Sequence, residues 1–354
     1  MAFDSKDSKL TVAISTASVL KVILILIGVG FLWLIRDIAA LLFVALILAS
    51  AFDPTIDWLQ RFHFPRSLGV IVIYAIFLSI LSSVIIGISG PIATEVRAIA
   101  EDLPEYYQAI NHNLEQFQAT SPFFTPDRVS NIRGGLDEFI ADLTQLASKN
   151  ALPVISKVFG GLLSLMLILV ITFYFSVHEP AVKHFIVWLV PKEKESQTID
   201  VIDKIQKKLG LWLRGQVLLS LIIFVIIYVG LKILGIRYAL VLALLAGFFE
   251  MVPYLGPVLS AVPTIFLTLI SPWGGLFKAF LVLLLYFFVQ QAENNLIVPK
   301  VMSKTVGLNP LVVIIAILIG AKIGGVVGAL MGVPVATALT VYLEALGYKR
   351  ELVV

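Results

Sequence analysis

Apolar residues in this chain fall into long runs separated by shorter polar stretches. The run from Leu68 to Ile88 contains no charged residue at all. A helix needs roughly 20 apolar residues to cross a bilayer, whereas the strands of a membrane barrel alternate over about 10 residues. The pattern therefore predicts an all-α, polytopic helical membrane protein.

The positions of these runs predict seven to eight membrane segments. Three spans are expected within residues 1–90, one span at 158–177, and a C-terminal transport core at 216–354. Inside the core, the stretches 238–270 and 311–343 are interrupted near their middle by Pro and Gly. We expect both to be broken or re-entrant hairpins, which secondary transporters place around a site at the bilayer midplane.

Two segments between the spans, 91–157 and 178–215, have apolar residues at helical spacing with polar residues between them. This spacing is typical of amphipathic helices, which bury one face and expose the other. The polar pair Arg36-Asp37 is expected to form a turn between the first two spans. We expect helices to end at prolines and paired glycines, namely Asp53-Pro54, Pro104, Pro122, Pro126 and Gly134-Gly135.

Lysine and arginine near span ends predict the orientation, because these residues accumulate on the cytoplasmic side. Segment 178–215 is rich in lysine, whereas segment 91–157 has few basic residues and more acidic ones. We therefore expect 178–215 to be cytoplasmic and 91–157 to be external. The same count predicts that both termini are cytoplasmic, in agreement with Lys6 and Lys9 near the N-terminus.

The first group of candidate functional residues surrounds Glu250, within otherwise apolar sequence. Pro253, Tyr254 and Gly256 follow it. Proline frees backbone carbonyls in the preceding turn, and glycine permits close approach of the backbone. Carbonyls and a carboxylate together can bind Na⁺ or exchange a proton, and ionisable residues inside a membrane are usually functional. The alternative is that Glu250 lies solvated at a hairpin turn.

A second polar group ends the next apolar run. Gln290, Glu293 and Asn294 are spaced i, i+3, i+4, so they share one face of a helix, and Asn295 follows them. We interpret these four residues as substrate-binding or ion-binding. A polar helix end at the lipid headgroups explains the pattern equally well.

Small residues and prolines in the same half are interpreted as hinge or packing positions. Glycines spaced by about four residues allow helices to pack closely or slide. These positions are Pro257, Pro299, Pro310, Gly320, Gly328, Gly332 and Pro334.

Composition narrows the class of protein. The chain of 354 residues is 59% hydrophobic, carries a net charge of +3 and has no cysteine. We expect no nucleic-acid partner, because the basic residues are not gathered into one patch, and no metal or other cofactor. Gly87-Ile88-Ser89-Gly90 resembles a serine-protease motif, but no histidine lies in a span to act as its base. We therefore do not expect an enzyme.

Four sequence blocks of the C-terminal half resemble the AI-2E transporter family, also called the autoinducer-2 exporter or PerM-like family. They are Glu250 to Pro257 with Pro263, Gln290 to Asn295 with Pro299, Gly307-Leu308-Asn309-Pro310, and Gly328-Ala329 to Gly332-Val333-Pro334. Lys322 departs from the pattern of the family. The resemblance covers nearly the whole chain.

The resemblance implies a multi-pass permease of the cytoplasmic (inner) membrane that exports a small polar molecule such as autoinducer-2, coupled to protons or cations. Because members of the family have also been linked to Na⁺(Li⁺)/H⁺ antiport, an antiporter is the alternative. A membrane scaffold without transport is a second alternative. The expected partners are a small-molecule or ion substrate, the lipid membrane and, because the amphipathic segments have apolar faces, further copies of the chain.

Overall fold

The computed structural model describes residues 23, 28, 30, 34–120, 125–147, 152–188, 190–302 and 308–347. Most of the first of the three spans expected within residues 1–90 lies outside these residues, as do Lys6 and Lys9, which were used for the orientation. The chain comprises two compact units, Met1–Val44 and Ala45–Val354. All the packing described below lies within the second unit.

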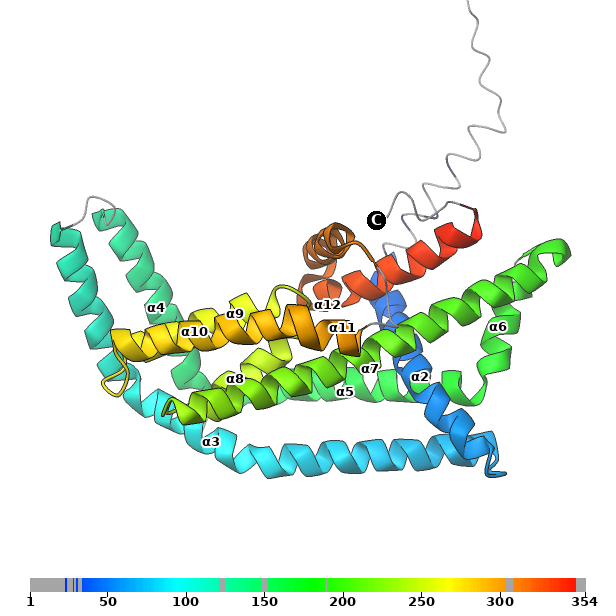
Figure 1. Ribbon diagram of the computed structural model, residues 1–354, viewed down its shortest axis with the longest axis horizontal. Helices are drawn as coiled ribbons and strands as arrows, with labels where there is room; N and C mark the ends of the chain where they lie inside the picture. The colour runs from blue at the N-terminus through cyan, green and yellow to red at the C-terminus, as the bar shows by residue number, and fades with distance from the viewer. Residues whose placement is uncertain are drawn as a thin grey trace, which may run out of the picture. The chain divides into compact units, whose positions relative to one another are not determined.

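Every regular element among the described residues is a helix (Figure 1). The elements before the C-terminal core are α2 (Arg36–Gln60), α3 (Arg66–Thr120), α4 (Pro126–Ala147), α5 (Leu152–Val177), α6 (Glu179–Trp188), η1 (Lys192–Lys194) and α7 (Glu195–Ile233). The core continues with α8 (Ala239–Phe249), α9 (Gly256–Ile270), α10 (Leu276–Ala292), the π-helix η2 (Glu293–Ile297), α11 (Val298–Val301) and α12 (Pro310–Ala345).

Five helical stretches are long and apolar enough to cross a membrane: Arg36–Gln60, Arg66–Gln108, Lys192–Ile233, Leu276–Val301 and Pro310–Ala345. Three shorter apolar helices accompany them: Ser164–Val177, Ala239–Phe249 and Gly256–Ile270. Large apolar side chains remain exposed along many of these helices. Such a surface is stable in contact with lipid but not in water. The prediction of a polytopic helical membrane protein is confirmed.

Several expected helix ends were wrong. Helix α2 continues through Pro54, α3 continues through Pro104, and α4 continues through Gly134-Gly135. Arg36-Asp37, expected to be a turn, starts α2. An interior proline removes one backbone hydrogen bond and a glycine costs about 1 kcal/mol, so long helices can contain both.

Proline does start a helix at Pro126, the first residue of α4, where the missing N–H is not needed. The other proline expected to end a helix in this region, Pro122, lies outside the described residues.

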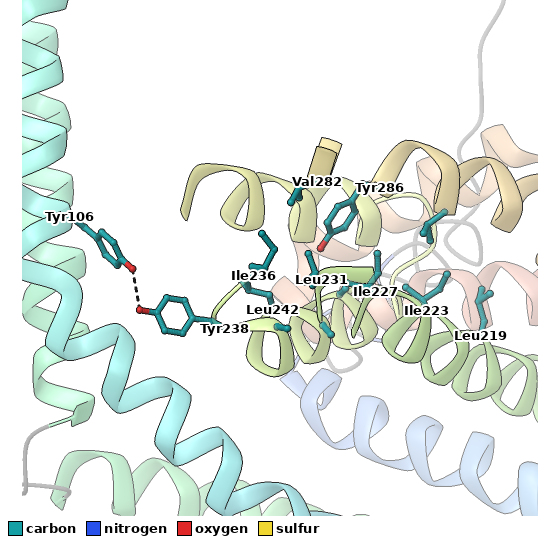
Figure 2. Close-up of a cluster of buried hydrophobic side chains, with 14 residues drawn as sticks. Tyr106, Leu219, Ile223, Ile227, Leu231, Ile236, Tyr238, Leu242, Val282 and Tyr286 are labelled. Atoms are coloured by element: carbon teal, nitrogen blue, oxygen red, sulfur yellow. Dashed lines mark hydrogen bonds between the residues drawn. The ribbon is translucent and has the colours of Figure 1, made fainter. Parts of the chain in front are cut away.

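The main apolar core joins α7, α8 and α10 (Figure 2). On α7, one face is formed by residues four apart: Leu219, Ile223, Ile227 and Leu231. The distances that a Cβ atom would have at a glycine show how closely these helices pack. On Gly247 of α8, a Cβ would lie 2.9 Å from the Phe224 side chain and 3.0 Å from the Ser220 carbonyl oxygen, both on α7. This close packing fixes α8 against α7.

Helix α3 also holds the start of α8. The Glu95 carboxylate accepts hydrogen bonds from the backbone N–H groups of Leu240, at 3.3 Å, and Val241, at 2.9 Å. These are N–H groups of the first turn of α8, which have no partner inside the helix. A negative charge at this end also complements the helix dipole. Glu95 therefore caps α8 from another part of the chain.

A tyrosine pair makes a second connection at the same place. The hydroxyls of Tyr106 on α3 and Tyr238 at the N-cap of α8 lie 3.0 Å apart (Figure 2). The Tyr238 hydroxyl also donates to the Asp102 carboxylate, which forms an ion pair with Arg237 at 2.9 Å. Both connections join α3 to the loop that precedes α8.

A charge network joins α2, α3, α6 and α7. Arg66 pairs with Asp53 at 3.3 Å, with Asp57 at 3.2 Å and with Glu179 at 2.5 Å. Lys183 pairs with Glu179 at 2.5 Å and with Asp203 at 2.7 Å. Burial lowers the pKa of Lys183, but its hydrogen bonds to Asp203 and Glu179 outweigh burial, and the net pKa is raised. The network keeps Lys183 charged.

Candidate functional site

Glu250 lies in the turn that joins α8 to α9. It is the C-cap of α8, and its backbone N–H donates to the carbonyl of Ala246. The residue is completely buried, and both carboxylate oxygens lack a hydrogen-bond partner among the described residues. The alternative of a solvated hairpin turn therefore does not describe this side chain. A buried polar group without a partner is expensive, and its presence needs an explanation.

Gly256 permits the turn around Glu250 to close. A Cβ at this position would lie 2.7 Å from the Glu250 Cα and 2.8 Å from its backbone nitrogen. Real Cβ atoms do not approach backbone atoms so closely, so only glycine fits. Tyr254, between them in sequence, has a φ of 65° and an exposed side chain, while Pro253 is half-buried.

Glu293 lies at the first residue of the π-helix η2, after α10. It is 5% exposed, and its carboxyl is an electrostatic neighbour of the Glu250 carboxyl. A π-helix adds one residue to a turn and commonly marks a functional site. Gln290 lies one turn earlier, with its Nε2 3.4 Å from Glu293 Oε2. The structure thus brings together the two glutamates that the sequence placed 43 residues apart.

The neighbouring amides face elsewhere. Asn294 and Asn295 are exposed. Asn294 Oδ1 accepts from Gln290 Nε2 at 3.3 Å, and Asn295 donates to the Gln291 carbonyl at 2.8 Å. Their predicted role in binding solute stays a prediction. Pro299 follows in α11 and is also exposed.

Sequence reasoning missed Gln216, the first residue of the expected C-terminal transport core. Gln216 is fully buried on α7, and its Nε2 donates to the backbone carbonyl of Glu250. Its Oε1 has no partner among the described residues. The available signal was an amide in apolar sequence, one helical turn before Ser220, whose hydroxyl also lacks a partner.

Buried hydroxyls on α9 form a second polar row that sequence reasoning missed. Ser260, Thr264 and Thr268 recur every four residues, and each donates to the carbonyl one turn earlier. The Tyr286 hydroxyl on α10 lies 3.1 Å from the Thr264 hydroxyl. These bonds satisfy the hydroxyls within the apolar core, so this row is structural.

Helix α12 reverses direction at Gly324 and Gly325, where Gly325 has a φ of 59°. The helix before this reversal continues past Ile319. Gly320 and Gly328 face each other across the arms. A Cβ on either glycine would overlap the carbonyl of the other.

The same close approach recurs one turn further from the reversal. A Cβ on Gly332 would lie 2.5 Å from the Ala316 carbonyl oxygen on the opposite arm. Pro334 is buried in the second arm. Pro310 begins the first arm, after an Asn309 side chain that caps the helix by accepting from Leu311 N at 2.9 Å.

A pocket of about 350 Å³ lies between the turn of α8–α9 and the reversal of α12. Its walls are apolar: Phe248, Phe249, Val252, Leu255, Leu259, Ala321, Gly325, Val326, Ala329 and Leu330. Pro257, half-buried at the start of α9, lies two residues beyond this lining. The pocket therefore lies between the tips of the two hairpins, and Glu250 follows Phe249 of its lining in the sequence.

The two carboxyls of the site can bind a positive charge that no described basic side chain provides. Neither Glu250 nor Glu293 forms an ion pair with a basic residue in the part of the chain that the structure describes. The same part contains no group of three His, Cys, Asp or Glu side chains of the kind that holds a divalent metal. Two adjacent buried carboxyls can share a proton or hold a monovalent cation.

Buried carboxyls within a bundle of apolar helices are typical of the ion sites of membrane transporters. The family model of the AI-2E family transporters matches residues 22–347. The chain therefore belongs to the AI-2E transporter family, as its resemblance predicted. It is a multi-pass membrane protein, and its membership implies a small-molecule or ion substrate.

Three relatives illustrate the range of the family. YueF of Bacillus subtilis is 27% identical over 302 residues, covering 82% of this chain and 79% of YueF. The sodium-lithium/proton antiporter of Halobacillus andaensis is 26% identical, covering 88% of this chain and 91% of the relative. The AI-2 transport protein TqsA of Escherichia coli is 24% identical, covering 91% of this chain and 89% of TqsA.

Proposed function

We propose that this protein is a secondary transporter in which the Glu250–Glu293 pair binds the coupling proton or monovalent cation. One observation carries the proposal: Glu250 is fully buried with two unpartnered oxygens, beside a second buried carboxyl. An unpaired buried carboxylate is strongly unfavourable, so the site is expected to hold a positive charge throughout the transport cycle. Exchange of that proton or cation couples its own flux to the flux of the transported cargo.

The first candidate cargo is a small polar molecule such as autoinducer-2, exported across the cytoplasmic membrane. Family membership and the relative named as an AI-2 transport protein support it. The second candidate is Na⁺(Li⁺)/H⁺ antiport, in which the cation itself is the cargo. The acid pair favours this candidate, because neither glutamate is paired with a basic residue in the part of the chain that the structure describes. The relative named as a sodium-lithium/proton antiporter also supports it.

The expected arrangement in the membrane belongs to the same proposal. Both termini and segment 178–215 face the cytoplasm, segment 91–157 lies outside, and several copies of the chain assemble through their amphipathic segments. Glu95 and Asp102 would then hold the start of α8 from the external side. Cysteine accessibility at single exposed sites in 91–157 and 178–215 tests this orientation directly, because the chain contains no cysteine of its own.

The test of function is proton flux into liposomes that contain the purified full-length protein, with Na⁺ or Li⁺ supplied on one side. We expect a cation-triggered flux in the wild type and its loss in Glu250→Gln, which keeps the shape of the side chain but removes its charge. Thr337→Val is the matched control, because Thr337 is also buried but bonds only within α12.

Three results are informative. Flux lost in Glu250→Gln and kept in Thr337→Val supports the proposal with the cation as cargo. Absence of cation-triggered flux, with Glu250-dependent efflux of autoinducer-2, supports export of the organic molecule. Equal transport by Glu250→Gln and wild type, for either cargo, would show that the acid pair is not the coupling site.

A further inference from the structure

Three buried oxygen atoms around the Glu250 backbone have no hydrogen-bond partner among the described residues. They are the two carboxylate oxygens of Glu250 and Oε1 of Gln216. Both residues have 0% of their surface exposed. Nearly all buried polar atoms in folded proteins have a partner. Glu293 can bond the Glu250 carboxyl only by sharing a proton with it, so these buried oxygens indicate a ligand that supplies positive charge or hydrogen-bond donors.

The chemistry of the contact fixes which end of the Gln216 amide is available. The amide donates to the Glu250 carbonyl, and a carbonyl can only accept, so the bonded atom must be the nitrogen. The oxygen is consequently the free end. It comes from α7, whereas the carboxylate comes from the α8–α9 turn. The free amide oxygen and the carboxylate thus come from two separate elements that meet at the Glu250 backbone.

These oxygens match the ligands of a hard cation, which prefers carboxylates, amides and carbonyls. A divalent ion would need more charge than the described surroundings offer, because no group of three acidic or histidine side chains forms there. An anion would be repelled by Glu250 and its neighbour Glu293. The ligand class that remains is a small monovalent cation.

We propose that Gln216 supplies its Oε1 as a neutral ligand to Na⁺ or Li⁺ held by Glu250, and so determines that the site accepts an alkali cation as well as a proton. A proton needs only the carboxylate, whereas a dehydrated cation needs several oxygens. This inference rests on the proposed role of Glu250 in coupling. It adds a binding residue on α7 that lies outside the four sequence blocks shared with the family.

The test is direct binding of ²²Na⁺ to the purified full-length protein at pH 8, in a choline chloride background, with Li⁺ as competitor. We expect saturable binding by the wild type and none by Glu250→Gln. Gln216→Met keeps the length of the side chain but removes both polar atoms, and it should weaken the Kd at least about tenfold. Thr337→Val, a buried polar residue elsewhere, should bind like the wild type.

Two further variants cover the case in which Gln216→Met does not fold. Gln216→Asn keeps the amide but shortens it by one methylene group, so it should also weaken the Kd. Gln216→Glu keeps an oxygen at the same reach but has no N–H for the Glu250 carbonyl, so it should bind Na⁺ more tightly than Gln216→Met. The melting temperature of each variant in choline chloride shows whether it is folded.

The outcomes separate this inference from the proposed function. Wild-type Kd in Gln216→Met or Gln216→Asn would overturn the role of Gln216, while a Glu250-dependent flux would leave the transporter intact. No ²²Na⁺ binding by the wild type would also overturn it, even where Glu250 couples proton flux to an organic cargo. Folded wild-type protein that shows no ²²Na⁺ binding, no cation-triggered proton flux and no efflux of autoinducer-2 would overturn both proposals.

Discussion

A single methyl group at Gly256 should disrupt the site. Gly256→Ala places a Cβ 2.7–2.8 Å from backbone atoms of Glu250 and Phe249. Ordinary contacts between carbon atoms begin at about 3.5 Å, so the backbone must separate by about 0.7 Å or more. Because the obstructing atoms belong to the backbone, no side-chain rotation can relieve the overlap. The displacement falls directly on the residue that carries the carboxylate.

Two opposing effects set the change in the free energy of unfolding. Overpacking of this kind costs about 1–3 kcal/mol. Alanine is favoured over glycine in a helix by about 0.5–1 kcal/mol, which offsets part of that cost. We expect a net loss of about 1–2 kcal/mol, seen as a melting temperature lower by a few degrees. The loss of transport should be larger, since a displacement near 1 Å at a reacting group can cost about 100-fold in rate.

The assay is the liposome flux measurement together with thermal melting in detergent. Gly87→Ala is the matched control, because Gly87 lies within α3 and a Cβ there meets no atom within 4 Å. The control should melt at or above the wild-type temperature and transport normally. Wild-type flux and melting temperature in Gly256→Ala would refute the reasoning, because the turn would then tolerate the displacement or Glu250 would not need its position.

Two further predictions concern packing and charge. Gly320→Ala should lower the melting temperature and the flux, because its Cβ would overlap the Gly328 carbonyl. The control Gly324→Ala, with open space around it, should melt no lower than the wild type. Equal melting temperatures of the two variants would contradict the close packing of the two arms. Lys183→Met should lower the melting temperature by removing the ion pairs with Glu179 and Asp203. Because the pKa of Lys183 is raised, its contribution is present below the usual lysine pKa of 10.5 and is lost as pH rises through the folded-state value. Melting curves between pH 7 and pH 11 should therefore show a difference between wild type and Lys183→Met that shrinks only at the alkaline end.

The sequence was sufficient to predict the class of fold because lipid imposes a simple rule. A segment must be apolar over about 20 residues to cross, and such runs are visible without any structure. Glu250 and Glu293 were identifiable by the same rule, since charges are rare within apolar runs. That the two glutamates lie close together could not be predicted, because 43 residues and two helices separate them in the sequence. Only packing of α8 and α9 against α10 and η2 decides that distance.

Other features depended on tertiary structure that local propensity does not encode. Pro104 and Gly134-Gly135 were expected to end helices, but their cost is small beside the hydrogen bonds of the long helices around them. The π-helix at Glu293 has no signature in sequence. Gln216 was overlooked because an amide at the start of an apolar run resembles a helix end at the headgroups, and only its contact with the Glu250 carbonyl distinguishes it.

The attachment of α8 has a consequence for how such a transporter can move. Its first turn is bonded to Glu95 on α3, and its C-cap residue, Glu250, is bonded to Gln216 on α7. Sliding α8 along its axis would break polar bonds at both ends together. At the pocket, the reversal of α12 meets the α8–α9 turn through apolar side chains, whose contacts re-form readily in another arrangement. The polar bonds of α12 to α7 lie at its far end, at Glu344 and Ala345. We therefore expect α8 to stay fixed during transport while the reversal of α12 moves against it.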